Sequence, residues 1–266
     1  MKQLLAILII VFSFASCDSE DQEVDNSPLT TTINIDVTYP KRSILSEWEI
    51  NFKFEYDNNG RLIKKNGGYG LFPADFLYNA YFNDQMYTTL TYVDNKVTVQ
   101  DFSEDPIAQP KIFYVVNGVN RIEEKEKPNL RDSQFSEKLF YKYSGDKLIE
   151  IVTVFPYRTS SKYVLTYSEK FYYDRNNNLI KTESEELHNG VYEGIKTVRT
   201  FEDYDTSLNP FKRLNLLEEY FYRSLSKNNF RKYTEERFDM YLGNLSSRSL
   251  TWTFQYNNTG TIIIRH

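Results

Sequence analysis

Apolar and polar side chains alternate in short runs along most of the chain after Thr30. In residues 51–56 and 251–256, every second side chain is aromatic and the side chains between them are polar. Successive side chains of a β-strand point to opposite faces of a sheet, so each run predicts a strand with one aromatic and one polar face. The runs are rich in Tyr, Phe, Thr, Ile and Val and are bounded by Asn, Asp and Gly. The sequence therefore predicts an all-β protein.

Helical features are confined to two segments. Pro73 suits the first position of a helix over residues 73–80. The Asn-Pro pair at 209–210 precedes residues 211–217, whose apolar side chains fall on one side of a helix. We expect one or two short helices here.

A turn unit recurs along the chain. An aromatic residue, any residue and Tyr precede a polar turn, and an apolar residue, Ile and a basic residue follow it. Asn and Gly in the turn supply the positive φ angles that tight hairpins require, so each copy predicts a β-hairpin. The copies cover residues 54–64, 171–181 and 254–265, with looser copies at 92–97, 113–122 and 141–149.

The spacing of the units indicates how many strands to expect. Tyr143, Tyr173 and Tyr204 are about thirty residues apart, the length of two strands and two connections. Residues 32–266 would then form a single large antiparallel β-meander of about 10–14 strands. A sheet of this width curls or divides into two packed sheets, and we favour a strongly twisted, partly rolled meander. Phe, Leu and Ile should line its inside, with Tyr, Thr and Lys facing water.

The N-terminus has the pattern of a signal peptide over residues 1–16. Lys2 precedes an apolar run at 4–14, and two small residues separate this run from Cys17, the only cysteine. This run of eleven residues is too short to span a bilayer core of about 30 Å. Residues 14–17 resemble the lipobox of bacterial lipoproteins, which implies that Cys17 is acylated and anchors the protein to a membrane. An ordinary secretory signal with an incidental cysteine is the alternative.

The following segment, residues 17–31, carries five acidic residues and no aromatic residue. Such a composition cannot bury enough apolar surface to fold, so we expect an acidic flexible tether. Acidic residues at this place also resemble the export signal of Bacteroidetes-type lipoproteins. That resemblance implies an outer-membrane protein that faces the cell surface, and a merely solvated spacer is the alternative.

The turn units themselves resemble a known family. Residues 56–63, with Tyr56, Asp57 and Gly60 followed by a Leu-Ile pair, resemble the YD repeat of Rhs-type proteins. The overall layout, including residues 204–211, resembles Bacteroidetes lipoproteins built from such hairpins. The resemblance implies a YD-repeat-like domain over residues 32–266 and a surface lipoprotein of unassigned activity.

Charge and histidine content argue against several functions. Apart from Lys2 and the five acidic residues of the tether, the chain's 32 basic and 37 acidic residues lie in residues 32–266, which are therefore nearly neutral. A nucleic-acid-binding protein needs a basic face, so we expect no such partner. The two histidines, His188 and His266, do not supply a zinc site or a Ser-His-Asp triad. We expect no cofactor.

Two acidic patterns bear on metal binding and catalysis. Asp174, Asn176, Asn178 and Glu185 match four positions of an EF-hand loop, but Leu179 replaces its invariant Gly, so we interpret the segment as a hairpin turn without a metal. Paired glutamates at 185–186, 218–219 and 235–236 are compatible with the two carboxylates that a glycoside hydrolase needs. We interpret them as exposed strand or strand-end positions and expect no enzyme, with a carboxylate-dependent glycoside hydrolase as the weakest alternative.

The Gly-rich segment at residues 66–78 interrupts the hairpin rhythm. It contains Tyr69, Phe72, Phe76 and Tyr78, and we treat these four as a candidate ligand-binding loop. The same loop would also serve to cover an open edge of the sheet. The function that we expect is a monomeric, surface-exposed binding or interaction module for glycan or protein. A purely structural envelope component is the alternative.

Overall fold

The computed structural model describes residues 29–34, 51–74, 77–103, 110–128, 136–155, 165–188, 190–256 and 262–263. Within these residues, fourteen strands form one sheet in which each strand pairs with its neighbours in sequence. Every pair of neighbouring strands in this sheet runs antiparallel. The expected single antiparallel meander is confirmed.

The strands follow one another with few interruptions. Those of the main sheet are β1 (Thr32–Asn34), β2 (Asn51–Tyr56), β3 (Leu62–Ala74), β4 (Leu77–Val93), β5 (Lys96–Phe102), β6 (Lys111–Val116), β7 (Ile122–Lys127), β8 (Glu137–Ser144), β9 (Lys147–Phe155), β10 (Leu165–Tyr173), β11 (Leu179–His188), β12 (Val191–Tyr204), β13 (Phe230–Asp239) and β14 (Gly243–Thr251). A second, two-stranded sheet consists of β15 (Gln255–Tyr256) and β16 (Ile262–Ile263).

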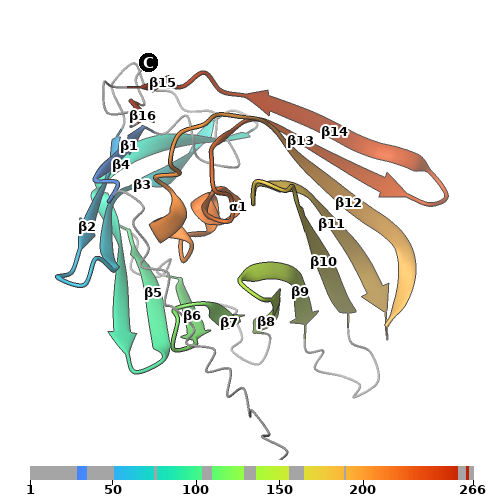
Figure 1. Cartoon of the computed structure of the whole chain (residues 1–266), viewed down its shortest axis with the longest axis horizontal. Coiled ribbons are helices and arrows are strands. Elements are labelled where there is room, and N and C mark those ends of the chain that lie inside the picture. Colours follow the sequence, from blue (N-terminus) through green and yellow to red (C-terminus); the bar gives the residue numbers. More distant parts are fainter. Residues whose placement is uncertain are drawn as a thin grey trace, which may run out of the picture.

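The main sheet is rolled, and the connection between β12 and β13 fills part of its concave side (Figure 1). We call this connection, residues 205–229, the plug. It contains two 3₁₀ turns, η2 (Lys212–Leu214) and η3 (Glu218–Tyr220), and the short helix α1 (Phe221–Ser224). The expected roll is confirmed. Within residues 211–217, where the sequence predicts a short helix, only the 3₁₀ turn η2 forms, and the short α-helix follows at Phe221–Ser224.

The helix expected at residues 73–80 is wrong. Residues 73–74 end β3 and residues 77–80 begin β4, and the two strands pair with Phe72 opposite Asn79. A helix of this length has a high nucleation cost, whereas the neighbouring strands already offer hydrogen-bonding partners. The long hairpin is therefore the more stable local structure.

The hydrophobic core lies between the plug and the concave face of the sheet. Phe211, Leu214 and Tyr220 of the plug are fully buried against strands β1 to β7. On the other side, Phe221 and Tyr222 pack against a cluster from β9 to β13 that includes Phe201. Burial of apolar surface contributes roughly 25 cal/mol per Å², so the plug supplies both halves of the roll with their main apolar partner.

Polar side chains organise the turns at the rim that carries the β2–β3, β6–β7 and β10–β11 connections. We call it the turn rim. Oδ1 of Asp57 accepts hydrogen bonds from the backbone N–H groups of Asn59 and Arg61, both at 2.9 Å. Asn117 and Asp174 accept the equivalent pairs in their own turns. The recurring Asp or Asn therefore fixes the turn conformation.

The prediction that the recurring tyrosines face water is wrong. The hydroxyl of Tyr92 donates to the carbonyl of Leu62 at 2.8 Å, and that of Tyr143 donates to the carbonyl of Ile122 at 3.0 Å. Tyr204 donates in the same way to Leu179. Each ring covers apolar neighbours while its hydroxyl finds a carbonyl at the turn rim. The repeat thus joins each hairpin to the preceding one.

A buried arginine holds the end of the plug. Arg223 lies with its guanidinium carbon 4.0 Å from the ring centre of Phe230 and 4.5 Å from that of Trp252. Its Nη1 donates to the carbonyl of Phe230 at 3.0 Å. Burial lowers the pKa of Arg223 to about 9, so the side chain is still a cation at neutral pH. Cation–π contacts with desolvated rings stabilise it there.

An ionic cluster holds the middle of the plug. Glu218 forms ion pairs with Lys125 and Lys127 of β7, and Lys65 of β3 reaches Glu219 at 2.5 Å. Burial works against the charged form of Glu218, but Lys125 and Lys127 lower its pKa overall. Ionised Glu218 therefore favours the folded state.

Replacing Arg223 should loosen the plug. Arg223→Ala loses the ring contacts and the hydrogen bond to Phe230, so we expect a loss of about 3 kcal/mol in the free energy of unfolding. Urea titration followed by circular dichroism measures it. Lys212→Ala, an exposed position of the same plug, is the matched control and should change stability by less than about 0.5 kcal/mol. Equal stability of the two variants would contradict the anchoring role of Arg223.

Glu218 predicts a pH dependence of stability. Its pKa is lowered on folding from the ordinary 4.5, so its contribution is present at neutral pH and is lost as the pH falls through the lowered value. Glu218→Gln should be less stable than the wild type at pH 7, and the difference should shrink below about pH 4.5. Urea titrations across this range measure it, with Glu202→Gln at an exposed ion pair as control. A difference that does not change with pH would count against the cluster.

Candidate ligand-binding pocket

The sequence-predicted site residues are only partly described by the structure. Cys17 and Phe76 lie outside the described residues, as do the side chains of Phe72 and Tyr78. Tyr69 lies on β3, where its ring contacts that of Phe52 edge-on at 5.7 Å and packs against the core. The described residues of the segment belong to the paired strands β3 and β4 rather than to an irregular loop, and ligand binding there stays a prediction.

Three of the four residues that match an EF-hand pattern, Asp174, Asn176 and Asn178, are engaged in the β10–β11 turn, and Glu185 lies on β11. Oδ1 of Asp174 accepts the N–H groups of Asn176 and Asn178, and Oδ1 of Asn178 accepts the N–H of Asn228. In the described part of the chain, no group of three or more His, Cys, Asp or Glu side chains is placed to hold a metal ion. His188 lies 3.3 Å from Glu186, next to the pocket described below.

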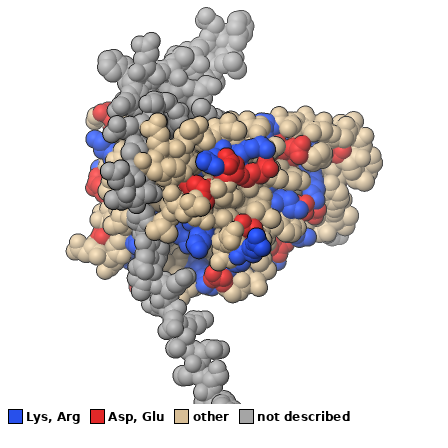
Figure 2. Space-filling model, turned by 45° about the horizontal axis from the view of Figure 1, so that its top comes forward, with Lys and Arg blue, Asp and Glu red and all other residues tan. Residues whose placement is uncertain are grey.

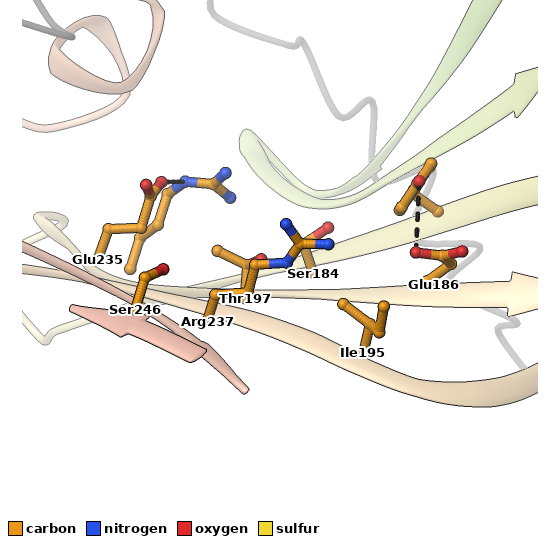
Figure 3. A pocket seen from close by; sticks show the side chains of 9 residues that line it. Ser184, Glu186, Ile195, Thr197, Glu235, Arg237 and Ser246 are labelled. Carbon is orange, nitrogen blue, oxygen red and sulfur yellow. Dashed lines mark hydrogen bonds and ion pairs between the residues drawn. The ribbon is translucent and has the colours of Figure 1, made fainter. Parts of the chain in front are cut away.

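A pocket of about 500 Å³ opens on strands β10 to β14 (Figure 3). We call it the polar pocket. It is lined by Tyr167 of β10, Ser184 and Glu186 of β11, Ile195, Thr197 and Arg199 of β12, Glu235 and Arg237 of β13, and Ser246 of β14.

The alternation of side chains places the polar pocket on the concave face. Tyr167 is four residues from the core residue Phe171, and Arg199 is two residues from the core residue Phe201. Residues at even spacing on a strand share a face, so core and pocket lie on the same side of the sheet. The plug covers the part of this face near the turn rim, and the pocket lies beyond it.

An ionic network separates the pocket from the plug. Arg199 binds Glu169 through Nη1 at 3.0 Å and Glu235 through Nε at 2.8 Å. Tyr222 of the plug donates to Glu169 at 2.9 Å, and Arg248 reaches Glu235 at 3.0 Å. Burial works against the charged form of Arg199, but its surroundings, chiefly Tyr222 and Glu169, raise its pKa overall. Arg199 is thus a fixed structural cation.

The opposite end of the pocket is formed by Tyr167 and Glu186. Tyr167 donates a hydrogen bond of 3.4 Å to Oε2 of Glu186, and the ring of Phe155 holds it edge-on at 5.9 Å. Burial and the charge of Glu186 raise the pKa of Tyr167, which therefore stays a hydrogen-bond donor at neutral pH. Ile195 is the only aliphatic side chain among the lining residues.

The lining of the polar pocket determines what it can bind. Hydroxyl groups of Tyr, Ser and Thr both donate and accept hydrogen bonds, carboxylates accept them and guanidinium groups donate them. A few convergent polar groups of this kind orient a polar ligand in a concave site. The pocket therefore suits a ligand with many hydroxyl groups rather than an apolar one.

Reasoning from the sequence missed this pocket. The sequence does contain an indication of it. Polar residues such as Thr197 and Arg199 lie at even spacing from the core residue Phe201, so they point to the same face of the strand. Polar residues on the core-facing side of a strand indicate a part of the inner face that the core does not cover.

Comparison with one solved structure shows a shared fold. A crystal structure of a porin-like protein from Bacteroides vulgatus matches with a TM-score of 0.53 at 12% identity, over 89% of this chain and 90% of that chain. A porin-like protein from Bacteroides uniformis matches with a TM-score of 0.46 at 13% identity, over 80% of each chain. No protein-family model and no curated protein matches the chain. In the described residues, no helix is long and apolar enough to cross a membrane.

Proposed function

We propose that this protein is a lipid-anchored protein of a bacterial outer membrane that faces the cell surface and binds an oligosaccharide in the polar pocket. The observation that carries the proposal is the lining of the pocket, in which hydroxyl groups and charged groups surround a hollow of about 500 Å³. Sugars present hydroxyl groups in several directions, and they are bound by such convergent donors and acceptors.

The anchor is supported by the sequence around Cys17. The first described residue is Leu29, so residues 17–28 form a connection that, fully extended, reaches about 40 Å. Its acidic composition suits a solvated tether. The porin-like protein of similar fold comes from Bacteroides vulgatus, which agrees with an envelope location for this chain.

A pore function is not part of the proposal. The plug occupies the concave side of the sheet, where a channel would need open space (Figure 1). The other face carries ion pairs between neighbouring strands, such as Lys142 with Glu150 and Lys196 with Glu183, as expected of a surface in water. Figure 2 shows Lys and Arg interspersed with Asp and Glu on the visible surface. These features support a water-exposed binding module.

The pocket also bears on the alternatives. A purely structural component has no need of a lined hollow, so the polar pocket favours ligand binding. For a glycoside hydrolase, two carboxylates must have different surroundings, one as acid and one as base or nucleophile. Glu169 and Glu235 instead share one arginine. Hydrolysis therefore gains no support from this network.

Filling the pocket should abolish binding. The full-chain protein, purified in detergent, should bind members of a glycan array, and Thr197→Trp should weaken this binding by about tenfold or more because its ring occupies the hollow. Thr200→Trp is the matched control, since Thr200 lies on the same strand and points to the opposite face. A wild type that binds no glycan, or a Thr197→Trp variant that binds as the wild type does, would refute the proposal.

The anchor has its own test. In a Bacteroidetes host, the wild type should fractionate with the outer membrane and carry the added mass of acyl chains at its N-terminus. Cys17→Ser removes the thiol that accepts them and should shift the protein to the soluble fraction. Ser16→Ala keeps a small residue before the cysteine and should behave as the wild type does. Membrane fractionation of the Cys17→Ser variant would argue against lipid anchoring.

A further inference from the structure

The two arginines of the polar pocket differ in their partners. Arg199 binds two carboxylates, Glu169 and Glu235. Arg237 is exposed, and within the described residues its guanidinium forms neither an ion pair nor a hydrogen bond. The charge of Arg199 is therefore compensated by carboxylates of the protein, whereas the charge of Arg237 is available to a ligand.

Exposed arginines are often simply solvated, but the neighbouring strands make Arg237 an exception. Strands β12, β13 and β14, which the structure describes throughout, carry five other basic residues. Each of these five forms at least one ion pair with an Asp or Glu: Lys196, Arg199, Arg231, Lys232 and Arg248. The single basic residue of these strands without a carboxylate partner is Arg237, and it lines the polar pocket.

The surroundings of Arg237 suit an anionic group. The sheet register places Thr197 directly opposite Arg237 on one side and Ser246 on the other, and Ser184 lies opposite Thr197. Figure 3 shows the guanidinium beside Ser184 and Thr197. Three hydroxyl groups can thus donate hydrogen bonds to the oxygens of an anion that the guanidinium holds.

Glu186 sets the orientation of such a ligand. It lies on the far side of the pocket from Glu235, with Arg237 between them in Figure 3. A carboxylate repels an anionic group but accepts hydrogen bonds from sugar hydroxyls. The acidic group of a ligand would therefore point to Arg237 and its hydroxyls to Glu186 and Tyr167.

We propose that the oligosaccharide is acidic and that Arg237 binds its anionic group. This inference rests on the proposed function, since it names the class of ligand for the same pocket. A guanidinium matches the planar, two-oxygen geometry of a carboxylate, so uronate-containing oligosaccharides are the first choice, and sulfate and phosphate esters share the required chemistry.

The test compares acidic and neutral glycans on the full-chain protein. An array carries uronate, sulfated and phosphorylated glycans beside neutral ones. It includes oligogalacturonate and its methyl ester, which share a sugar backbone but present a carboxylate and a neutral ester, respectively. Acidic glycans should bind at least about tenfold more tightly than neutral ones, and raising NaCl from about 50 to about 500 mM should weaken their binding.

Variants of Arg237 identify the residue responsible. Arg237→Gln should reduce the affinity for acidic glycans by about tenfold or more and leave neutral glycans within about twofold. Arg237→Lys keeps the positive charge but loses the paired N–H donors of the guanidinium, so its affinity for acidic glycans should lie between those of the wild type and Arg237→Gln. Arg231→Gln is the matched control, because Arg231 lies on the same strand, pairs with Asp203 and does not line the pocket. Urea titration of the Arg237 variants should match the wild type, because the side chain is exposed.

The outcomes separate this inference from the proposed function. If the protein binds only neutral glycans and Thr197→Trp abolishes that binding, the pocket stands and the acidic ligand is refuted. Unchanged binding of acidic glycans by Arg237→Gln also refutes it. If the wild type binds no glycan of either kind, the proposed function fails and the inference fails with it.

Discussion

Packing of the plug against the concave face of the rolled sheet is the interaction on which the rest of the structure depends. A sheet of fourteen strands with one apolar face must bury that face, either against itself or against another layer. Here a single connection supplies the layer. Phe211, Leu214 and Tyr220 meet the N-terminal strands, and Phe221 and Tyr222 meet the C-terminal strands. The two halves of the sheet therefore pack against the same segment, the plug, and the core of each half depends on it.

The limited size of the plug explains where a ligand site remains. Near the turn rim, inward side chains are apolar or are tyrosines whose hydroxyls reach backbone carbonyls. Beyond the plug, the same inner face carries Arg199, Glu235 and Arg237, because it meets water there instead of the core. Tyr222 joins the two regions through Glu169. Anchoring of the plug and the shape of the pocket are thus coupled through one ionic network.

Much of the fold follows from local pattern. The period of two and the turn units at residues such as Asp57 and Asp174 predict antiparallel hairpins, and the number of units predicts the width of the sheet. The pair at 209–210 predicts the short helical elements. The helix prediction for residues 73–80 is wrong because Pro73 suits the start of a helix as well as the end of a strand. Only the pairing between β3 and β4 decides between the two. The pocket lies beyond what a single sequence predicts, because alternation does not tell which strands the plug covers. Arg199 meets Glu169 and Glu235 from two other strands, and this contact depends on the register of the whole sheet.

Native-state hydrogen exchange tests the central role of the plug most directly. The amides of Leu214, Leu217 and Tyr220 each donate to a carbonyl three residues earlier and report on the plug, and those of Phe201 and Tyr233 report on the sheet. If the plug holds the roll together, both sets should exchange with the same free energy and the same dependence on urea, through global unfolding. Plug amides that exchange through a local opening of low free energy, while the sheet stays protected, would contradict the account.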